Sequence, residues 1–227
     1  MFDFYGTVVD MQAGLTEAIR PYLRAKGSTL EPGRVVTWWR RTHFEASMID
    51  ALLGRDHTPY REIGQQAVDY TLERAGIAHT ADEVADLVGA IERLRPFPDA
   101  IEALAALKDH GHSLVILSNG DPDMLARGVA YSGTAHLFDR VISVSEAGAF
   151  KPHAATYRTA CSLVGVEPEQ VVFVANHAFD CVGAKAAGMR TAFVDRRRRP
   201  FGNAKYPPDL VVRDFRELAE MLTPGPR

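Results

Sequence analysis

The sequence predicts an α/β fold, in which a parallel sheet forms the core and a helical cap is inserted into it. Two observations support this prediction. From Pro96 onward, short apolar stretches alternate with helix-length stretches, which is the pattern of parallel strands joined by crossover helices. Between residues 11 and 94 the pattern is helical and lacks strand signals. We therefore predict a core of residues 1–10 and 95–227 and a cap of residues 11–94.

The chain begins with an apolar stretch that ends in an acid, Met1-Phe2-Asp3, followed by a glycine-containing turn up to Thr7. At the end of a buried strand, before such a turn, backbone N–H groups converge, so a carboxylate there stays ionised and directed. We interpret Asp3 as a nucleophile. A central strand normally has about five residues. Either this strand is truncated, or the protein starts further upstream.

Glycine and proline residues divide the cap into four predicted helices, at about residues 13–26, 32–53, 59–76 and 81–93. The last helix begins with Thr80-Ala81-Asp82-Glu83, a capping-box pattern.

In the core, short apolar stretches predict strands at residues 113–118, 140–144, 171–175, 190–195 and 210–212. Helices are predicted before, between and after them, at 98–108, 122–130, 154–164, 180–187 and 215–222. This order corresponds to a doubly wound, Rossmann-like sheet with helices on both faces.

Polar side chains follow four of these apolar stretches. In a doubly wound sheet, ligands bind in the crevice at the carboxyl ends of the strands. We expect the following residues to meet there: Asp3, Ser118 with Asn119, Lys151, and His177 with Asp180. An acid, a hydroxyl, an amine and a second acid at one edge indicate chemistry rather than packing.

The composition indicates an ordinary globular protein, with 227 residues, 46% hydrophobic and 24% charged, and a formal net charge of -3. This charge gives no bias toward nucleic acid or an anionic membrane, so we expect a small-molecule partner. Cys161 and Cys181 form neither a metal-type spacing nor a disulfide framework, and no stretch resembles a signal peptide or a membrane span. We expect a cytoplasmic protein.

Over nearly its whole length the chain resembles the haloacid dehalogenase superfamily. The resemblance rests on the acid turn Asp3 to Thr7, on Leu117-Ser118-Asn119-Gly120, on Lys151-Pro152 and on the loop that ends at Asp180. Most of that superfamily are magnesium-dependent phosphatases, with an acid two residues after the nucleophile and a Gly-Asp pair in the fourth motif. This chain has Tyr5 and Ala175-Asn176 at those positions. Because Mg²⁺ prefers a carboxylate-anchored octahedron of oxygens, we expect no metal site and no cofactor.

The remaining motifs resemble the L-2-haloacid dehalogenase (type II) branch. They are Phe2 to Thr7, Leu117 to Gly120, Lys151-Pro152 with Tyr157, and Ala178-Phe179-Asp180. In the cap, Trp39-Arg40 followed by Phe44-Glu45 is similar to a helix of that branch, which makes Arg40 the substrate-facing arginine, with Arg41 as its rival. Where many members have serine and asparagine, this chain has Ala175 and His177.

The resemblance implies that Asp3 attacks the halogen-bearing carbon of a short (S)-2-haloacid and forms an ester. Water activated by Asp180 would then hydrolyse that ester. The resemblance also implies that Lys151 offsets charge beside Asp3 and, together with Ser118, holds the substrate carboxylate. Asn119, Phe179 and Arg40 would surround the departing halide. Thr7 would hydrogen-bond Asp3, while Tyr5 and Tyr157 complete the pocket wall and His177 donates a hydrogen bond in the pocket. A homodimer through the cap helices is also implied.

Simpler interpretations exist for each motif. Asp3 alone is an exposed acid near a frayed terminus, Lys151 a solvated loop charge and Asp180 a helix cap. The stretch from Ser118 to Gly120 is a turn, with Asp121 as the N-cap of the next helix. Trp38 to Arg41 form a packed helix face. The run Arg196 to Arg199 in isolation is typical of an anion-binding or nucleic-acid-binding patch, but we favour the simpler interpretation, a solvated loop.

Two other functions stay open. One is a Mg²⁺-dependent phosphatase or phosphonatase on the same fold. The other is a non-catalytic, ligand-binding descendant with a truncated first strand, which the short N-terminus and Ala175 suggest.

Overall fold

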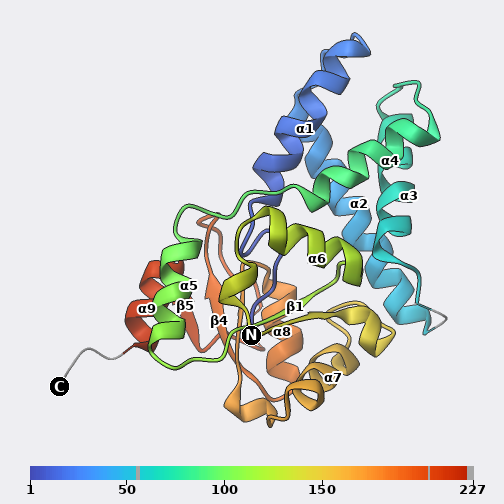
Figure 1. The fold of residues 1–227 in the computed structure, drawn as a ribbon. Coiled ribbons are helices and arrows are strands. Elements are labelled where there is room, and N and C mark those ends of the chain that lie inside the picture. Colours follow the sequence, from blue (N-terminus) through green and yellow to red (C-terminus); the bar gives the residue numbers. More distant parts are fainter. Residues whose placement is uncertain (55–56, 204, 224–227) are drawn as a thin grey trace.

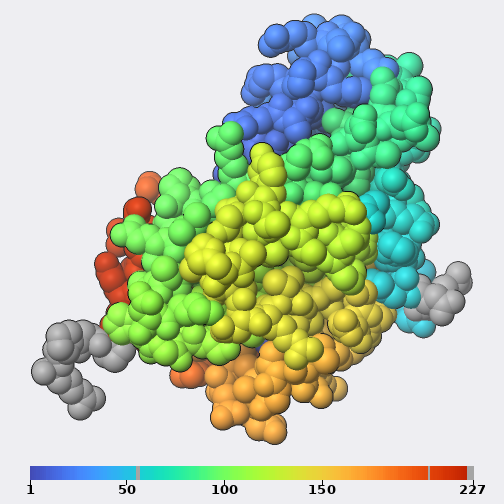
Figure 2. Space-filling view, in the orientation of Figure 1, coloured from blue at the N-terminus to red at the C-terminus, as the bar shows by residue number. Residues whose placement is uncertain are grey.

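The computed structural model describes residues 1–54, 57–203 and 205–223, so positions 55–56, 204 and 224–227 of the predicted parts lie outside the described residues (Figure 1). The predicted α/β fold is confirmed, because helices occupy the first part of the chain and parallel strands alternate with helices in the rest. Figure 2 shows the blue and blue-green helices of the first part projecting from the body of the molecule, while its cyan part lies along the side of that body. Whether the chain divides into domains at residues 10 and 95 stays a prediction.

We call residues 11–92 the helical lobe. Its elements are α1 (Met11–Ala25), α2 (Pro32–Leu53), α3 (Tyr60–Arg74), α4 (Ala81–Gly89) and the 3-10 helix η1 (Ala90–Glu92). The predicted capping box is confirmed, since the Thr80 hydroxyl accepts from Glu83 N and the Glu83 carboxylate accepts from Thr80 N. Buried side chains such as Leu15, Trp39 and Leu72 hold the helices together.

The remainder of the chain forms the sheet and its helices. The strands are β1 (Val115–Ser118), β2 (Arg140–Ser143), β3 (Val172–Ala175), β4 (Arg190–Val194) and β5 (Leu210–Val212). The helices are α5 (Ala100–Asp109), α6 (Pro122–Tyr131), α7 (Ala154–Val164), α8 (Ala178–Ala186) and α9 (Phe215–Leu222), with 3-10 helices η2 (Ala135–Leu137), η3 (Val144–Ala147) and η4 (Pro168–Gln170). Figure 1 shows α5 beside α9 on one side of the strands and α7 with α8 on the other.

Residues 1–3 join the two halves of the sheet. β1 pairs in parallel with β2, and β3, β4 and β5 pair in parallel with one another. Phe2 forms parallel bridges to Ile116 on one side and to Val174 on the other. The order along the sheet is therefore β2, β1, residues 1–3, β3, β4 and β5. When the strands are numbered along the chain with residues 1–3 as the first, this is the order 3-2-1-4-5-6 of a doubly wound fold. The order reverses at residues 1–3, which is where such sheets bind ligands.

The first segment is short, but both of its neighbours hold it. Phe2 N donates to Val115 O at 2.7 Å, and Asp3 N donates to Val174 O at 3.0 Å. The Phe2 ring packs edge-on against Phe138 and Phe215, at 6.0 and 5.6 Å between ring centroids. The backbone that carries Asp3 is thus fixed by hydrogen bonds on both sides and by aromatic packing.

Asp121 joins the helical lobe to the core. It occupies the N-cap position of α6, as predicted, but its side chain accepts no hydrogen bond from that helix. Its carboxylate accepts from Tyr60 N at 2.8 Å and from Arg61 N at 2.9 Å, which are the first two amides of α3. The predicted N-cap position of Asp121 is therefore confirmed, but its side chain caps a different helix, which lies about 60 positions earlier in the sequence.

Within the described residues, the helices are too short or too polar to cross a membrane.

Candidate active site

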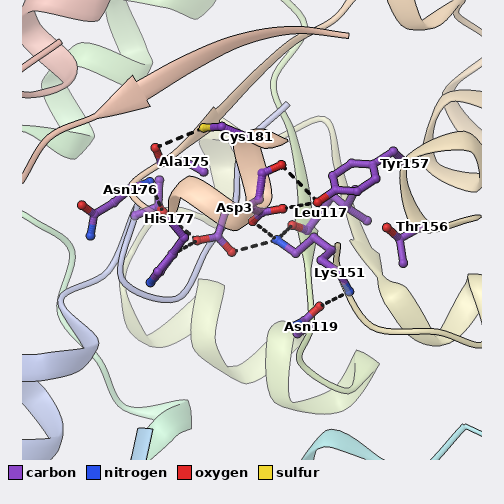
Figure 3. Close-up of polar contacts among 12 residues, drawn as sticks. Asp3, Leu117, Asn119, Lys151, Thr156, Tyr157, Ala175, Asn176, His177 and Cys181 are labelled. Carbon is purple, nitrogen blue, oxygen red and sulfur yellow. Dashed lines mark hydrogen bonds and ion pairs between the residues drawn. The ribbon is translucent and has the colours of Figure 1, made fainter. Parts of the chain in front are cut away.

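A buried lysine, Lys151, lies between two carboxylates, and Figure 3 shows it beside Asp3. Lys151 Nζ lies 3.0 Å from Asp3 Oδ1, 2.6 Å from Asp180 Oδ2 and 2.9 Å from the carbonyl oxygen of Leu117. Because an ammonium group has three N–H donors, these contacts use all of them. Lys151 is 1% exposed, so it is not the solvated loop charge of the simpler interpretation. To hold a substrate carboxylate, it would have to give up one of these bonds.

Asp3 is buried and ionised. Burial opposes its ionisation, but the charge of Lys151 and hydrogen bonds from His177 and Thr7 outweigh burial and hold the pKa of Asp3 well below its ordinary value. Thr7 Oγ1 donates to Asp3 Oδ2 at 2.6 Å, and His177 Nδ1 lies 3.3 Å from the same oxygen. Figure 3 shows Asp3 between Lys151 and His177. The nucleophile predicted from the sequence is therefore available as a carboxylate.

Asp180 lies behind Lys151. Burial raises the pKa of Asp180 above its ordinary value, with repulsion from Asp3 in the same direction and the charge of Lys151 opposing both. Tyr157 donates to Asp180 Oδ1 at 2.6 Å, so both carboxylate oxygens have partners. Asp180 is the third residue of α8, which excludes the helix-cap interpretation. Gly183 permits this arrangement, because a Cβ there would lie 2.6 Å from the Tyr157 hydroxyl.

A cavity of about 640 Å³ opens in front of Asp3, between the core and the helical lobe. The predicted site residues that line it are Asp3, Tyr5, Arg40, Ser118, Asn119, Lys151, His177 and Phe179. The other three, Thr7, Tyr157 and Asp180, lie behind this lining. Thr7 donates to Asp3, Asp180 accepts from Lys151, and Tyr157 donates to Asp180. The structure thus brings all the predicted residues together in two layers, and their roles stay predictions.

Two polar side chains face the cavity with free donors. Ser118 Oγ is buried and has no hydrogen-bond partner among the described residues. Asn119 Oδ1 accepts from Lys151 N at 3.0 Å, which leaves the amide NH₂ as the end of that side chain available to a ligand. A buried unpartnered hydroxyl is costly, so a ligand that accepts a hydrogen bond from Ser118 would be stabilised.

Aromatic rings form one wall of the cavity. Tyr5 stacks on Tyr60, with 5.9 Å between ring centroids and planes 6° apart, and Tyr60 stacks on His43 at 4.0 Å. The ring centroid of Phe179 lies 4.4 Å from that of Phe44. Sequence reasoning missed His43 and Tyr60, since a histidine inside a helix and a tyrosine after a proline carry no local signal of a pocket.

Arg40 reaches the nucleophile loop from α2. Its Nη1 donates to Gln12 Oε1 at 2.9 Å. Gly6 has a φ of +86°, and a Cβ there would lie 3.0 Å from His177 Cε1 and 3.3 Å from Arg40 Nη2. Only glycine fits this turn while Arg40 and His177 approach. Arg41 also lines the cavity but is exposed, so Arg40 is the deeper of the two.

The interpretation of Arg196 to Arg199 as a solvated loop is wrong for Arg196, whereas Arg197 to Arg199 are exposed. The Arg196 guanidinium is buried and pairs with both oxygens of Asp99, at 2.9 and 3.1 Å. It also donates to Thr7 O at 3.0 Å and lies 3.8 Å from the Phe97 ring centroid. Arg196, Arg197 and Arg199 line the cavity. The contacts of Arg196 could not be predicted from the run itself, because Phe97 and Asp99 lie about a hundred positions earlier.

The residues at the two expected metal-binding positions do not suit a magnesium ion. Tyr5 belongs to the aromatic wall, and Asn176 Nδ2 donates to Gly6 O at 2.9 Å, so neither supplies a carboxylate. Across the described ranges, His, Cys, Asp and Glu side chains do not gather in threes as a metal site requires. The Lys151 ammonium occupies the place between the two carboxylates.

Comparison with known proteins gives concordant results. The family model described as haloacid dehalogenase-like hydrolase matches residues 1–188. The chain is 38% identical to an (S)-2-haloacid dehalogenase of Xanthobacter autotrophicus over 199 residues, which cover 86% of this chain and 74% of that protein. It is 31% identical to (S)-2-haloacid dehalogenase 1 of Pseudomonas sp. (strain CBS-3), over 98% of this chain and 95% of that one.

Solved structures are also similar to this chain. One is the L-2-haloacid dehalogenase of Xanthobacter autotrophicus with chloropropionic acid covalently bound. It superimposes with a TM-score of 0.86 and 31% sequence identity, over 99% of this chain and 98% of that chain.

Proposed function

The chain belongs to the haloacid dehalogenase-like hydrolases, and from this premise we propose that it is an (S)-2-haloacid dehalogenase that converts short (S)-2-haloacids into 2-hydroxyacids. The observation that carries the proposal is an ionised Asp3 at the point where the strand order reverses, facing a cavity. Similarity to a dehalogenase solved with chloropropionic acid covalently bound supports a covalent route.

In the first step, an Asp3 oxygen forms a bond to C2 of the substrate. The carbon–halogen bond breaks on the opposite side, and the halide leaves with the bonding electrons, which inverts the configuration at C2. Lys151 favours this step because its charge keeps Asp3 deprotonated. Ser118 supplies a free hydroxyl for the substrate carboxylate.

Three groups are positioned to stabilise the halide. Asn119, Arg40 and Phe179 all line the cavity, and we propose that the amide NH₂, the guanidinium and the ring edge of these residues contact the halide. Each offers positive charge or a positive dipole, which is most valuable when the negative charge moves onto the halogen. Gly6 keeps Arg40 close to the nucleophile loop.

In the second step, water attacks the carbonyl carbon of the Asp3 ester, and the 2-hydroxyacid leaves with an oxygen that came from Asp3. We propose Asp180 as the group that takes the proton from this water, because burial raises its pKa toward the range of a general base. Once Asp3 is esterified, its negative charge is gone, so Lys151 is freer to move and open a path from the cavity to Asp180.

The phosphatase alternative lacks its acids at Tyr5 and Asn176. We also propose a cytoplasmic location. We further propose a homodimer, and light scattering coupled to size-exclusion chromatography tests this oligomeric state. The helical lobe would act as the cap that closes over the site.

The test is halide release from (S)-2-chloropropionate with single-turnover labelling. Excess enzyme in ¹⁸O-water is expected to place the label in Asp3 first and in lactate only in later turnovers. Asp3→Asn is expected to abolish halide release, and Asp180→Asn is expected to accumulate the ester after one halide per enzyme. Asp109→Asn, which changes an exposed acid at the end of α5, serves as the control and keeps full activity.

Three outcomes would contradict the proposal. Folded wild-type protein that releases no halide from any short haloacid supports the non-catalytic alternative. Phosphate release from a generic phosphoester that requires Mg²⁺ supports the phosphatase. Direct labelling of lactate in the first turnover excludes the ester.

A further inference from the structure

Four arginines around the cavity lack an acidic partner. Arg40, Arg41, Arg197 and Arg199 line the same cavity as Asp3. Among the residues that the structure describes, none of the four lies within 4.0 Å of a carboxylate oxygen, whereas Arg196 pairs closely with Asp99. Arg41, Arg197 and Arg199 are exposed, so they form the mouth of the cavity, and Arg40 lies deeper.

These guanidinium groups repel one another. Burial and then the charge of Arg197 lower the pKa of Arg40 to about 10. Burial and then the charge of Arg199 lower the pKa of Arg197, and Asp10 opposes both effects. The protein as a whole is slightly acidic, with a formal net charge of -3, yet the cavity mouth carries an excess of positive charge, which Asp10, an acid that also lines the cavity, offsets only in part. An anion at this mouth would relieve the repulsion.

The fold holds this mouth in place. Arg196 is fixed to Asp99, to the Thr7 carbonyl and against Phe97, directly before Arg197. Asp195 Oδ1 accepts from Arg199 N at 2.9 Å and closes the loop on the other side. Arg197 and Arg199 are therefore presented toward the cavity from an anchored loop, which is how a binding group is kept ready for its ligand.

The cavity is larger than a short haloacid requires. Its volume of about 640 Å³ falls in the range of roughly 300–1,000 Å³ that holds drug-sized ligands. An acid of two or three carbons on Asp3 would leave the arginine end without an anion. The size and the charge of the cavity thus indicate a longer substrate with a second negative group.

We propose that Arg197 and Arg199 form a second anion subsite, and that the preferred substrates are (S)-2-haloacids with a second carboxylate, such as 2-chlorosuccinate and 2-chloroglutarate. This inference rests on the proposed function. The first carboxylate and the halogen occupy the inner part of the site near Ser118, Asn119 and Arg40, and the second carboxylate lies at the mouth. The second carboxylate takes no part in the bond changes at C2.

The test compares (S)-2-chloropropionate with (S)-2-chlorosuccinate. The wild type is expected to have a kcat/KM about tenfold higher for chlorosuccinate, because charge-assisted hydrogen bonds contribute that much or more. In the double variant Arg197→Gln/Arg199→Gln this advantage disappears through KM, and chloropropionate changes by less than about threefold. Arg198→Gln removes one positive charge, half of what the double variant removes, from the same loop at a residue that does not line the cavity, and it is expected to match the wild type.

Two kinetic results would overturn the subsite. One is equal kcat/KM for both substrates in the wild type. The other is an equal loss for both substrates in the double variant and in Arg198→Gln, which is the signature of long-range attraction rather than of a site.

If neither chloropropionate nor chlorosuccinate releases halide, the proposed function is refuted. The subsite is then tested by calorimetric titration with succinate and propionate. Succinate that binds the wild type about tenfold more tightly than propionate, and loses this advantage in the double variant, supports the subsite. Equal binding of the two acids overturns it.

Discussion

The two ends of the cavity handle charge in opposite ways. At the inner end, Lys151 lies between Asp3 and Asp180, and all its donors are used. At the mouth, exposed arginines line the cavity without an acidic partner among the described residues. Buried charges must be paired because desolvation is expensive, and pairing fixes their positions. Charge without an acidic partner lies mainly where solvent reaches it, and there it is free to bind a ligand. Arg40, which lies deeper, is the exception, and burial lowers its pKa.

The largest effect is expected from removing the inner cation. Lys151→Met would leave two buried carboxylates without a counter-charge, so the free energy of unfolding is expected to fall by about 3–5 kcal/mol. One carboxylate would then take up a proton, and kcat is expected to fall at least about 1,000-fold. Urea unfolding and halide release measure the two effects.

The matched control is Lys185→Met. Lys185 pairs with Asp209 at 2.7 Å, but both side chains are partly exposed. Such a pair contributes less than about 1 kcal/mol, and activity should not change. Equal losses of unfolding free energy in both variants would show that the buried Lys151 contributes no more to stability than the partly exposed Lys185, which contradicts the prediction.

An intermediate effect is expected from His43, which lies on α2 two positions after Arg41 but is buried. Burial lowers the pKa of His43 to about 4, while the hydrogen bond to the Tyr60 carbonyl opposes this shift. The unfolded chain therefore binds a proton at higher pH than the folded protein does. The stability that His43 contributes is complete above about pH 6.5 and is lost as pH falls toward 4, by about 3 kcal/mol.

Urea unfolding at several pH values between 7 and 4 measures this loss. His43→Gln cannot titrate and keeps a donor for the Tyr60 carbonyl, so its stability should vary less with pH than that of the wild type. His110→Gln, at an exposed position after α5, is the control and should follow the wild type. A wild-type slope in His43→Gln would contradict the prediction.

The smallest effect is expected from salt. Exposed charges are screened within about 10 Å at 0.1 M ionic strength, whereas buried ones are screened much less. With a salt that carries no halide, KM for chloropropionate is expected to rise about threefold between low and high ionic strength, and kcat to stay constant. The Arg197→Gln/Arg199→Gln variant should show a weaker rise. A change in kcat instead would mean that solvent ions reach the inner charges.

Most of the fold could be predicted because its signals are local. Pro32 at the start of α2 and the capping box at Thr80 mark helix boundaries within a few residues. The pairing of residues 1–3 with both halves of the sheet could not be predicted, because the bonds of Phe2 to Val115 and Leu117 join distant parts of the chain. Asp121 shows the same limit, since a local rule identified its cap position but not the helix that it caps.

The inner site was accessible to sequence reasoning because Asp3 and Ser118 end apolar stretches and Asp180 lies five residues after another. The mouth was not. A run of arginines is usually solvated, and only the contacts of Arg196 with Phe97 and Asp99 turn this run toward the cavity. The sequence also did not indicate that Lys151 uses all its donors within the protein.

The carboxylate of Asp121 has a consequence for how the molecule folds. α3 starts at Tyr60, where its N-cap residue Pro59 makes no side-chain hydrogen bond to the helix, and Asp121 of the core supplies the acceptors for its first two amides. A side-chain cap contributes about 1 kcal/mol to a helix. A fragment of residues 11–94 would therefore begin α3 with unpaired amides and fray there. During synthesis, the first turn of α3 can therefore be completed only after Asp121 has been added to the chain and has folded against it.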